Sequence, residues 1–381
     1  MNLFFEQVIS RRDFLKKCVW GGTSLAIIVK SLKTASAQDL RHGYVNPQPA
    51  LHWSALPKGN IKCILCPREC TVKPGMRGFC RVRENREGKY YTLTYGNPCS
   101  VHIDPIEKKP FFHLLPGTTV LSLATAGCNL TCKHCQNWEI SQASPEDTDN
   151  IVLSSKDIIT LAKRYKSPSI AYTYTEPVIF YEYMLETSKL AKKEGILNVL
   201  HSNGYINQKP LEELCLYLDG ANIDLKGFTN EFYTSITSGT LNPVLETLKT
   251  LKKNKVHLEI TNLIIPTKND NIDDIKKMAE WIVKELGKDT PLHVSRFYPM
   301  YKLTNLSPTP AETLKKAHQT ARAAGLDYVY IGNLPGASEE HTYCPSCKKL
   351  IIERVGYTVK TINVKNGKCP FCNKKIPGRW A

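Results

Sequence analysis

Cysteines at metal-ligand spacing are the residues of this chain most able to do chemistry. They form three groups, which are Cys63, Cys66, Cys70 and Cys80, then Cys128, Cys132 and Cys135, then Cys344, Cys347, Cys369 and Cys372. In a chain of 381 residues, such close spacing indicates metal binding more readily than a disulfide scaffold. Cys18, Cys99 and Cys215 stand apart and are predicted to be packing residues.

The middle group has three cysteines, whereas closed metal sites have four ligands. It lies in the segment GCNLTCKHC, Gly127 to Cys135, and the next cysteine is Cys215. Ferredoxin-type clusters and structural zinc sites each take four protein ligands. Three thiolates therefore predict a metal centre with one position open to another molecule.

The C-terminal group, Cys344-x2-Cys347 and Cys369-x2-Cys372, encloses a β-rich stretch and predicts a zinc-ribbon-like module. Four closed thiolates make a structural site, and a rubredoxin-like iron site has the same ligands, so zinc and iron both remain open. The stretch from 344 to 381 is rich in Lys and Arg and has one acidic residue, Glu353. Because it offers few stacking aromatics, a solvated face or docking to a protein is favoured over nucleic acid.

The N-terminal group has x2, x3 and x9 spacing, with Gly75 and Gly78 allowing tight turns around a bound ion. It matches no standard zinc pattern closely. We therefore expect either a structural metal or an auxiliary iron–sulfur cluster there, with disulfides or free thiols as the alternative.

The elements that position these groups alternate between strands and amphipathic helices. Seven β-rich runs are predicted at Thr118–Ala126, Ser169–Glu176, Ile196–Asn203, Gly220–Gly227, Val256–Ile265, Leu292–Pro299 and Tyr328–Gly332. Helical segments lie between them, such as Ser154–Tyr165, which opens with a Ser cap and an acidic first turn. The pattern predicts an α/β fold with a parallel barrel or a doubly wound sheet.

Polar residues fall at the predicted carboxyl ends of these strands, where both architectures place their chemistry. They are Thr173, Thr175, Glu176, His201, Ser202, Asn203, Asp224, Lys226, Thr261, Asn262, His293, Ser295, Arg296 and Asn333. Each could be an ordinary cap or a satisfied core group. Their common position at one end predicts a shared pocket.

Composition excludes a mainly disordered or membrane-spanning chain, since 42% of residues are hydrophobic, 23% are charged, and no clean apolar run reaches about 18 residues. The formal charge of +16 overstates the charge of the mature protein. Part of it belongs to a basic N-terminal leader, and metal-bound thiolates add uncounted negative charge.

The leader contains SRRDFLKK at residues 10–17, an apolar segment from Val19 to Val29 and the small-residue pattern ASA at 35–37. It resembles a twin-arginine export signal and predicts a periplasmic or membrane-associated protein, with no membrane span unless the signal is uncleaved. A basic amphipathic start of a cytoplasmic protein is the alternative.

The cysteine loop and its surroundings resemble the radical S-adenosylmethionine (radical SAM) superfamily. GCNLTCKHCQNWEIS is similar to the branch that contains pyruvate formate-lyase activating enzymes. With YTYTEPVIFYEY, SNGY, NIDLKGF, TNLIIPTKND, HVSRFYPMYKL, YVYIGN and the terminal cysteine module, the chain resembles the radical enzyme of the AmmeMemoRadiSam system. The resemblance implies a partial (β/α)6-type TIM barrel.

The predicted organisation therefore has five parts. They are a signal peptide at 1–37, a linker at 38–60, a Cys-rich extension at 61–115, the barrel at 116–340 and the zinc-ribbon-like module at 341–381.

The resemblance implies that Cys128, Cys132 and Cys135 hold a 4Fe–4S cluster whose open iron binds the methionine part of S-adenosylmethionine. One electron from the cluster would cleave this cofactor and produce a 5′-deoxyadenosyl radical, which abstracts hydrogen from a substrate. A low-potential donor would supply the electron. A fourth ligand such as His134 would close the site, so the family instead implies a residue near the adenine at that position.

Five further residues match family positions around S-adenosylmethionine. Thr175 and Glu176 stand where activating enzymes have a Gly-Gly-Glu segment against the methionine amino group. Asp224 and Lys226 match the segment near the ribose and carboxylate, and His293 matches a histidine near the cofactor.

Two functions from different classes are open at this point. One is a radical SAM enzyme whose substrate is unidentified, with a protein or another member of the AmmeMemoRadiSam system as the candidate. The other is a non-catalytic metal-binding scaffold that docks partners through its basic C-terminal module. Retention of the open cysteine motif with Asp224, Lys226 and His293 favours the enzyme.

Overall fold

The structure is a computed structural model that describes residues 40–380. The predicted signal peptide at 1–37 lies outside these residues. The segment His42–Ala381 forms one compact unit. Within residues 40–380, no helix has the length and apolar character needed to cross a bilayer.

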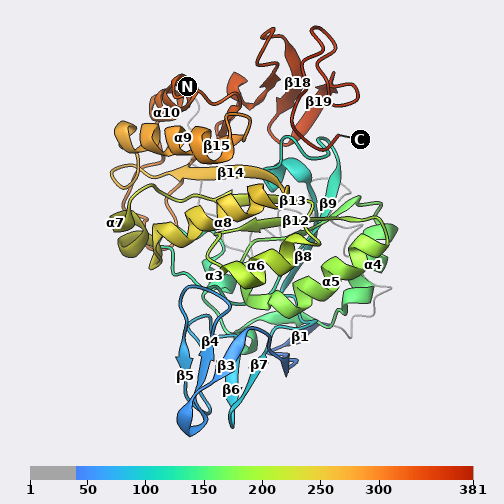
Figure 1. The fold of residues 1–381 in the computed structure, drawn as a ribbon, viewed down its shortest axis with the longest axis vertical. Helices are drawn as coiled ribbons and strands as arrows, with labels where there is room; N and C mark the ends of the chain where they lie inside the picture. Colours follow the sequence, from blue (N-terminus) through green and yellow to red (C-terminus); the bar gives the residue numbers. More distant parts are fainter. Residues whose placement is uncertain (1–39, 381) are drawn as a thin grey trace, which may run out of the picture. The chain divides into compact units, whose positions relative to one another are not determined.

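A parallel sheet forms the core of this unit (Figure 1). Its strands are β9 (Thr119–Ala124), β11 (Ser169–Tyr172), β12 (Leu197–Ser202), β13 (Gly220–Asp224), β14 (His257–Ile264), β15 (Leu292–Arg296) and β16 (Val329–Gly332). They pair in that order, and the antiparallel strand β8 (Ser100–Pro105) adds to the β9 edge. All seven predicted strands are confirmed, and β9 and β16 lie at opposite ends of the parallel run, as in a partial barrel.

Amphipathic helices connect the strands and cover the sheet. They are α4 (Ser155–Arg164), α5 (Tyr181–Lys193), α6 (Gln208–Cys215), α8 (Leu241–Lys253), α9 (Ile272–Leu286) and α10 (Ala311–Ala323). Figure 1 shows α5, α6 and α8 along the outside of the sheet. The predicted cap of α4 is confirmed, because Ser154 accepts from the Asp157 amide and Asp157 accepts from the Ser154 amide.

Shorter helical turns complete the connections. They are α3 (Trp138–Ser141), α7 (Asn230–Phe232), η2 (Pro57–Gly59), η3 (Ile106–Lys108), η4 (Pro145–Asp147), η5 (Pro177–Phe180), η6 (Tyr233–Thr237) and η7 (Ser338–Glu340). Two further strands, β1 (Leu40–His42) and β10 (Asp149–Ile151), pair with each other in a separate two-stranded sheet.

The N-terminal module (blue in Figure 1) contains two three-stranded sheets. Their strands are β2 (Gln48–Pro49), β3 (Trp53–Ala55), β4 (Ile61–Cys63), β5 (Thr71–Val72), β6 (Arg83–Arg86) and β7 (Lys89–Thr92). The segment 38–60, predicted as a linker, contributes β2 and β3, which pair with β7 and β4. Its Pro- and Asn-rich composition indicates loops, but its pairing partners come later in the chain.

A buried ion pair fastens this module to the barrel. The Arg83 guanidinium donates to both carboxylate oxygens of Glu182 on α5, at 2.9 and 2.7 Å. The two side chains are 1% and 7% exposed. Because the pair is bidentate and excluded from water, breaking it leaves an unpaired buried charge.

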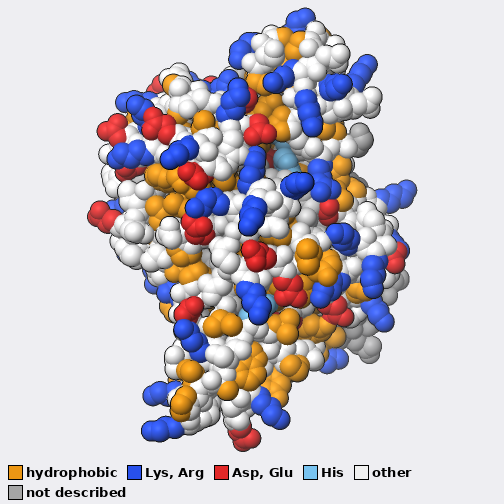
Figure 2. Space-filling model, in the orientation of Figure 1, with side chains coloured by type: hydrophobic (Ala, Val, Ile, Leu, Met, Phe, Trp, Pro, Cys, Tyr) orange, Lys and Arg blue, Asp and Glu red, His pale blue; other side chains and the backbone are white. Residues whose placement is uncertain are grey.

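The C-terminal module consists of the antiparallel strands β17 (Thr342–Tyr343), β18 (Leu350–Val355) and β19 (Thr358–Ile362). Arg354 is fully buried and donates to the Phe112 carbonyl and the Thr342 hydroxyl, each at 2.7 Å. Figure 2 shows Lys and Arg side chains dispersed over the visible surface of the unit, with acidic and apolar groups between them.

Candidate functional site

A cavity of about 890 Å³ lies at the carboxyl ends of the parallel strands. Its lining brings together most of the predicted residues, namely Cys128, Cys132, Cys135, Thr173, Thr175, Glu176, His201, Ser202, Asn203, Asp224, Lys226, Thr261, His293, Ser295 and Asn333. Its volume is in the range of pockets that bind small cofactors.

Two of the predicted strand-end residues have other roles. Asn262 donates to the Leu225 carbonyl at 2.7 Å, and Arg296 donates to the Thr309 carbonyl at 2.8 Å. Neither lines the cavity. Strand position alone therefore overestimates the site, since alternate residues of a strand point to opposite faces.

The cysteine loop follows β9 directly and is held by backbone contacts. The Thr131 amide donates to the Thr237 carbonyl at 3.1 Å, and the Gly127 amide donates to the Ile140 carbonyl at 2.9 Å. Burial raises the pKa of the Cys132 thiol to about 12, and burial also raises the pKa of Cys128. Both thiols are thus poised to lose a proton only when a cation is present to stabilise the thiolate.

Asn203, which directly follows β12, contacts this loop through its side chain. The Asn203 Nδ2 group donates to Oδ1 of the Asn129 side chain at 2.8 Å. The same nitrogen lies 3.9 Å from Cys128 Sγ. Sequence reasoning placed Asn203 at a strand end and did not link it to the cysteines. The only signal was the SNGY motif itself.

Glu176 joins the ends of β11 and β12. Its Oε1 accepts from the Val178 amide at 3.1 Å and from the Ser202 hydroxyl at 2.7 Å, and its Oε2 accepts from the Asn203 amide at 2.8 Å. Burial raises its pKa despite these donors. One acceptor site on Oε2 is still available, because a carboxylate oxygen can accept two hydrogen bonds.

Asp224 lies between Lys226 and His201 in the cavity wall. Its carboxylate is 2.8 Å from Lys226 Nζ and 3.2 Å from His201 Nε2. Burial by itself would raise the pKa of Asp224, but Lys226 and His201 outweigh it and hold the pKa well below its usual range. Burial would likewise lower the pKa of Lys226, yet Asp224 and Cys132 raise it, so both groups are charged at neutral pH.

His293 reaches the cavity from β15, and its position depends on a residue that sequence reasoning missed. Its Nε2 is 2.7 Å from Glu259 Oε2, which leaves Nδ1 for a ligand. Glu259 is completely buried, and it also accepts from the backbone amides of Phe112 and His113. The available signal was a single acidic residue within the apolar run at 256–265.

His134 lines the cavity within the cysteine loop, and its Nδ1 is buried without a hydrogen-bond partner. Burial, together with Lys226, lowers its pKa to about 3, so the ring is neutral. An orphaned polar atom in a cavity wall fits a polar ligand group, since leaving it unpaired costs about 1–3 kcal/mol.

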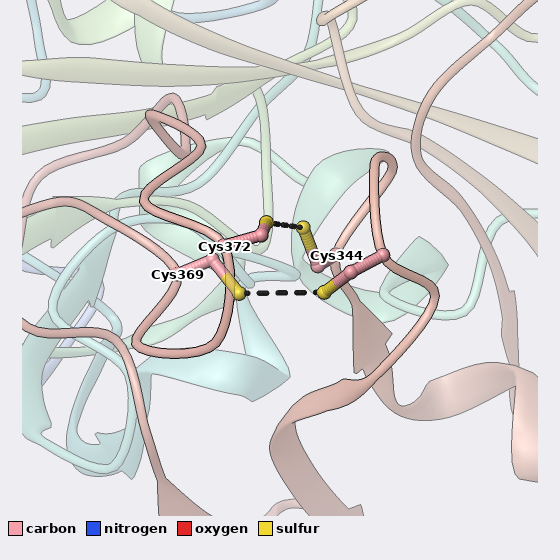
Figure 3. Close-up of side chains that lie close together, drawn as sticks. Cys344, Cys369 and Cys372 are labelled. Atoms are coloured by element: carbon pink, nitrogen blue, oxygen red, sulfur yellow. Dashed lines mark hydrogen bonds between the residues drawn. The ribbon is translucent and has the colours of Figure 1, made fainter.

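The C-terminal cysteines form a compact four-sulfur group. Cys344 Sγ lies 3.5 Å from Cys372 Sγ, and Cys347 Sγ lies 3.7 Å from Cys369 Sγ (Figure 3). All four sulfurs are within 4.8 Å of one another. Tetrahedral ligands at a Zn–S distance of 2.3 Å stand about 3.8 Å apart, so the group fits a single metal ion.

Fold and site together define a class of protein, a partial parallel α/β barrel whose first strand leads into three cysteines that line a cavity. Comparisons with known proteins agree with this class. Residues 122–282 match the family described as the Radical SAM superfamily. The chain belongs to the radical SAM superfamily, and it is an enzyme.

Individual relatives differ in how much of the chain they match. An uncharacterized protein of Methanocaldococcus jannaschii is 49% identical over 86% of this chain and 98% of its own length. Pyruvate formate-lyase 1-activating enzyme of Escherichia coli is 21% identical over 50% of this chain and 83% of its own. A radical SAM methyltransferase from Sphaerobacter thermophilus, 12% identical, aligns over 84% of this chain and 85% of its own with a TM-score of 0.47.

Proposed function

We propose that this enzyme binds a 4Fe–4S cluster through Cys128, Cys132 and Cys135 and uses it to cleave S-adenosylmethionine reductively. The observation that carries the proposal is the placement of these three thiols, without a fourth, on one cavity with Lys226 and the orphaned Nδ1 of His134. When bound, the cluster supplies the electron that converts S-adenosylmethionine into methionine and a hydrogen-abstracting 5′-deoxyadenosyl radical.

The chain's own residues would orient the cofactor by charge and hydrogen bonding. Lys226 is a fixed cation in the wall and suits a carboxylate, while the remaining acceptor site of Glu176 Oε2 suits an ammonium or hydroxyl group. Thr175 donates its hydroxyl to the Thr125 carbonyl, so this side chain instead ties β11 to β9. Thr175 is therefore proposed as a positioning residue.

Asp224, His134 and His293 would face other parts of the cofactor. Asp224 keeps Lys226 charged and oriented through its Oδ2 atom, while its Oδ1 atom contacts His201 Nε2. Neutral His134 offers Nδ1 to a polar edge, and His293 offers Nδ1 while Glu259 fixes the ring. Sheltering these groups from water strengthens each interaction.

The substrate would enter over a rim that the barrel and the C-terminal module share. Tyr298, Val355 and Tyr357 line the cavity and are 40%, 56% and 50% exposed. Exposed apolar side chains at the edge of a cavity suit a segment of a macromolecule better than a small polar metabolite. We therefore propose a protein substrate, in line with the activating-enzyme relative, and a place in the AmmeMemoRadiSam system.

Formation of 5′-deoxyadenosine tests this function. The protein is reconstituted anaerobically with iron and sulfide, reduced and given S-adenosylmethionine, and the products are separated by chromatography. The native chain and a Cys215→Ala control should form 5′-deoxyadenosine, because Cys215 lies on α6 outside the cavity, and Cys132→Ala should not. A bound cluster without product in the native chain would instead favour the scaffold.

We also propose that residues 1–37 direct export by the twin-arginine route, supported by the order of paired arginines, apolar segment and ASA. Fused to a folded reporter, residues 1–40 should deliver it to the periplasm, and an Arg11→Lys, Arg12→Lys pair should retain it in the cytoplasm. Equal retention of both fusions would support the cytoplasmic alternative.

A further inference from the structure

The N-terminal cysteines are brought together by a hairpin and two turns. The Cys63 amide donates to the Cys70 carbonyl at 2.9 Å, and Cys66 closes a turn by accepting from the Glu69 amide at 3.0 Å. A second turn, in which the Arg81 amide donates to the Gly78 carbonyl, presents Cys80. The segments meet, because a Cβ added to Gly78 would stand 3.9 Å from Cys70 Cβ.

The Cys66 thiol lies within electrostatic reach of the other three thiols of the quartet. Burial raises the pKa of Cys66, and the Cys63, Cys80 and Cys70 thiols raise it further. All four are free cysteines. The group therefore has the composition of a four-thiolate metal site.

The sulfur atoms of the N-terminal quartet are spread more widely than those of the C-terminal quartet. Among the residues that the structure describes, only the C-terminal quartet has three or more potential ligand atoms that all lie within 4.8 Å of one another. The triad at 128, 132 and 135, which the family associates with a cluster, exceeds this limit, and so does the N-terminal quartet. A four-iron cluster needs more widely spaced sulfurs than an ion with 2.3 Å bonds.

The quartet packs directly against the loop that carries the triad. A Cβ on Gly127, the residue before Cys128, would lie 2.7 Å from the Cys80 carbonyl oxygen. On the other side, Arg68, two residues after Cys66, donates to the Asn129 carbonyl at 2.8 Å. The first contact joins a cysteine of the quartet to the residue before the triad, and the second joins residues that lie beside each group.

The quartet also has an outer and an inner side. Cys63 and Cys80 are buried in the same apolar cluster as Cys132, whereas Cys66 and Cys70 are partly exposed. Met76 and Phe79, beside the quartet in sequence, are 59% and 38% exposed. Exposed apolar side chains on this edge suit the docking of a partner protein.

We propose that Cys63, Cys66, Cys70 and Cys80 bind a second 4Fe–4S cluster that passes single electrons from a docked flavodoxin-type protein to the cluster of the triad. One electron leaves the reduced donor, reduces the second cluster from its 2+ to its 1+ state, and then reduces the first cluster in the same way, so the second returns to 2+. The relay rests on the proposed function, whereas the second cluster itself does not.

Iron and sulfide analysis of the full chain tests the second cluster. A variant with Cys128→Ala, Cys132→Ala and Cys135→Ala cannot hold the first cluster. After anaerobic reconstitution it should retain about four iron and four sulfide per chain, with the paramagnetic resonance signal of a reduced cluster. Further replacement by Cys66→Ser and Cys70→Ser should remove them. The intact C-terminal quartet can add one zinc or iron ion to these totals. Absence of sulfide from the triad variant, whatever its metal content, would overturn the proposal.

The relay is tested by comparing two reductants. In a Cys66→Ser, Cys70→Ser variant with an intact triad, 5′-deoxyadenosine formation is measured with a chemical reductant and with reduced flavodoxin. The ratio of the flavodoxin rate to the chemical rate should fall relative to the native chain. An unchanged ratio would overturn the relay, whereas lack of product from the native chain with the chemical reductant would refute only the proposed function.

Discussion

Replacing Gly127 by alanine probes the contact between the N-terminal module and the cysteine loop. Gly127 has a φ of +96°, a left-handed conformation that disfavours any side chain. Its added Cβ would also stand 2.6 Å from Val82 Cγ1 and 2.7 Å from the Cys80 carbonyl oxygen. Because the second of these atoms belongs to the backbone, the substitution requires the two segments to move apart.

The expected loss of stability has two parts. The left-handed conformation costs a non-glycine residue about 1–2 kcal/mol. Overpacking at a close contact adds about 1–3 kcal/mol. Gly195→Ala is a matched control, because Gly195 has a φ of +69° and its added Cβ meets no atom within 4 Å. Gly195→Ala should lose only the conformational contribution of about 1–2 kcal/mol. Gly127→Ala should lose both contributions, about 2–5 kcal/mol of the free energy of unfolding in total.

Urea unfolding of the full chain measures the free energy of unfolding of both variants and of the native protein. Iron analysis of the reconstituted proteins then shows whether separating Cys80 from Gly127 impairs loading of the cysteine loop. The reasoning is refuted if Gly127→Ala destabilises the protein no more than Gly195→Ala does.

Three further predictions concern the ion pair, the acid response and the C-terminal metal. Glu182→Gln leaves the buried Arg83 charge unpaired and should lower the free energy of unfolding in urea by about 3–5 kcal/mol. The control Glu194→Gln removes a carboxylate from an ion pair on the surface and should lower it by about 0–1 kcal/mol. Equal losses in the two variants would contradict the role of burial. Because the pKa of His134 falls from 6.5 to about 3 on folding, the unfolded chain binds a proton more readily between these values, so stability decreases as the pH falls from 6.5 towards 3. His134→Phe should flatten the melting temperature against pH over this window, and an unaltered slope would count against burial as the cause. Cys347→Ser should release one metal ion from the C-terminal quartet and speed amide hydrogen exchange in β18. If this variant has lost the ion but exchanges at the native rate, the ion is not structural.

Local signals in the sequence accounted for most of the fold. Strand β14 lies within the predicted run 256–265, and α4 begins after the predicted Ser154 cap. Such elements depend on side-chain periodicity and on hydrogen bonds within a few residues. Strands β2 and β3 were missed because they are short and are formed by pairing with β7 and β4, which follow later in the chain.

The candidate site was predictable in its residue types and less so in its contacts. Asp224 and Lys226 lie on the cavity as expected from the end of a parallel strand. Glu259 was missed, because only its partner His257 is close in sequence. His293 is on the neighbouring strand, and the backbone amides of Phe112 and His113 precede the barrel. Hydrogen bonds between distant segments leave no periodic signal in the sequence.

The sequence by itself determined the chemistry available to this protein, because the spacing of Cys128, Cys132 and Cys135 sets which ligands one short loop can offer to a metal. Only the tertiary structure decided how the cysteine groups relate to one another. The C-terminal sulfurs meet closely enough for one ion, and Cys80 packs against Gly127. The physical reason is that ligand spacing is a property of a few adjacent residues, whereas these distances result from packing between segments far apart in the chain.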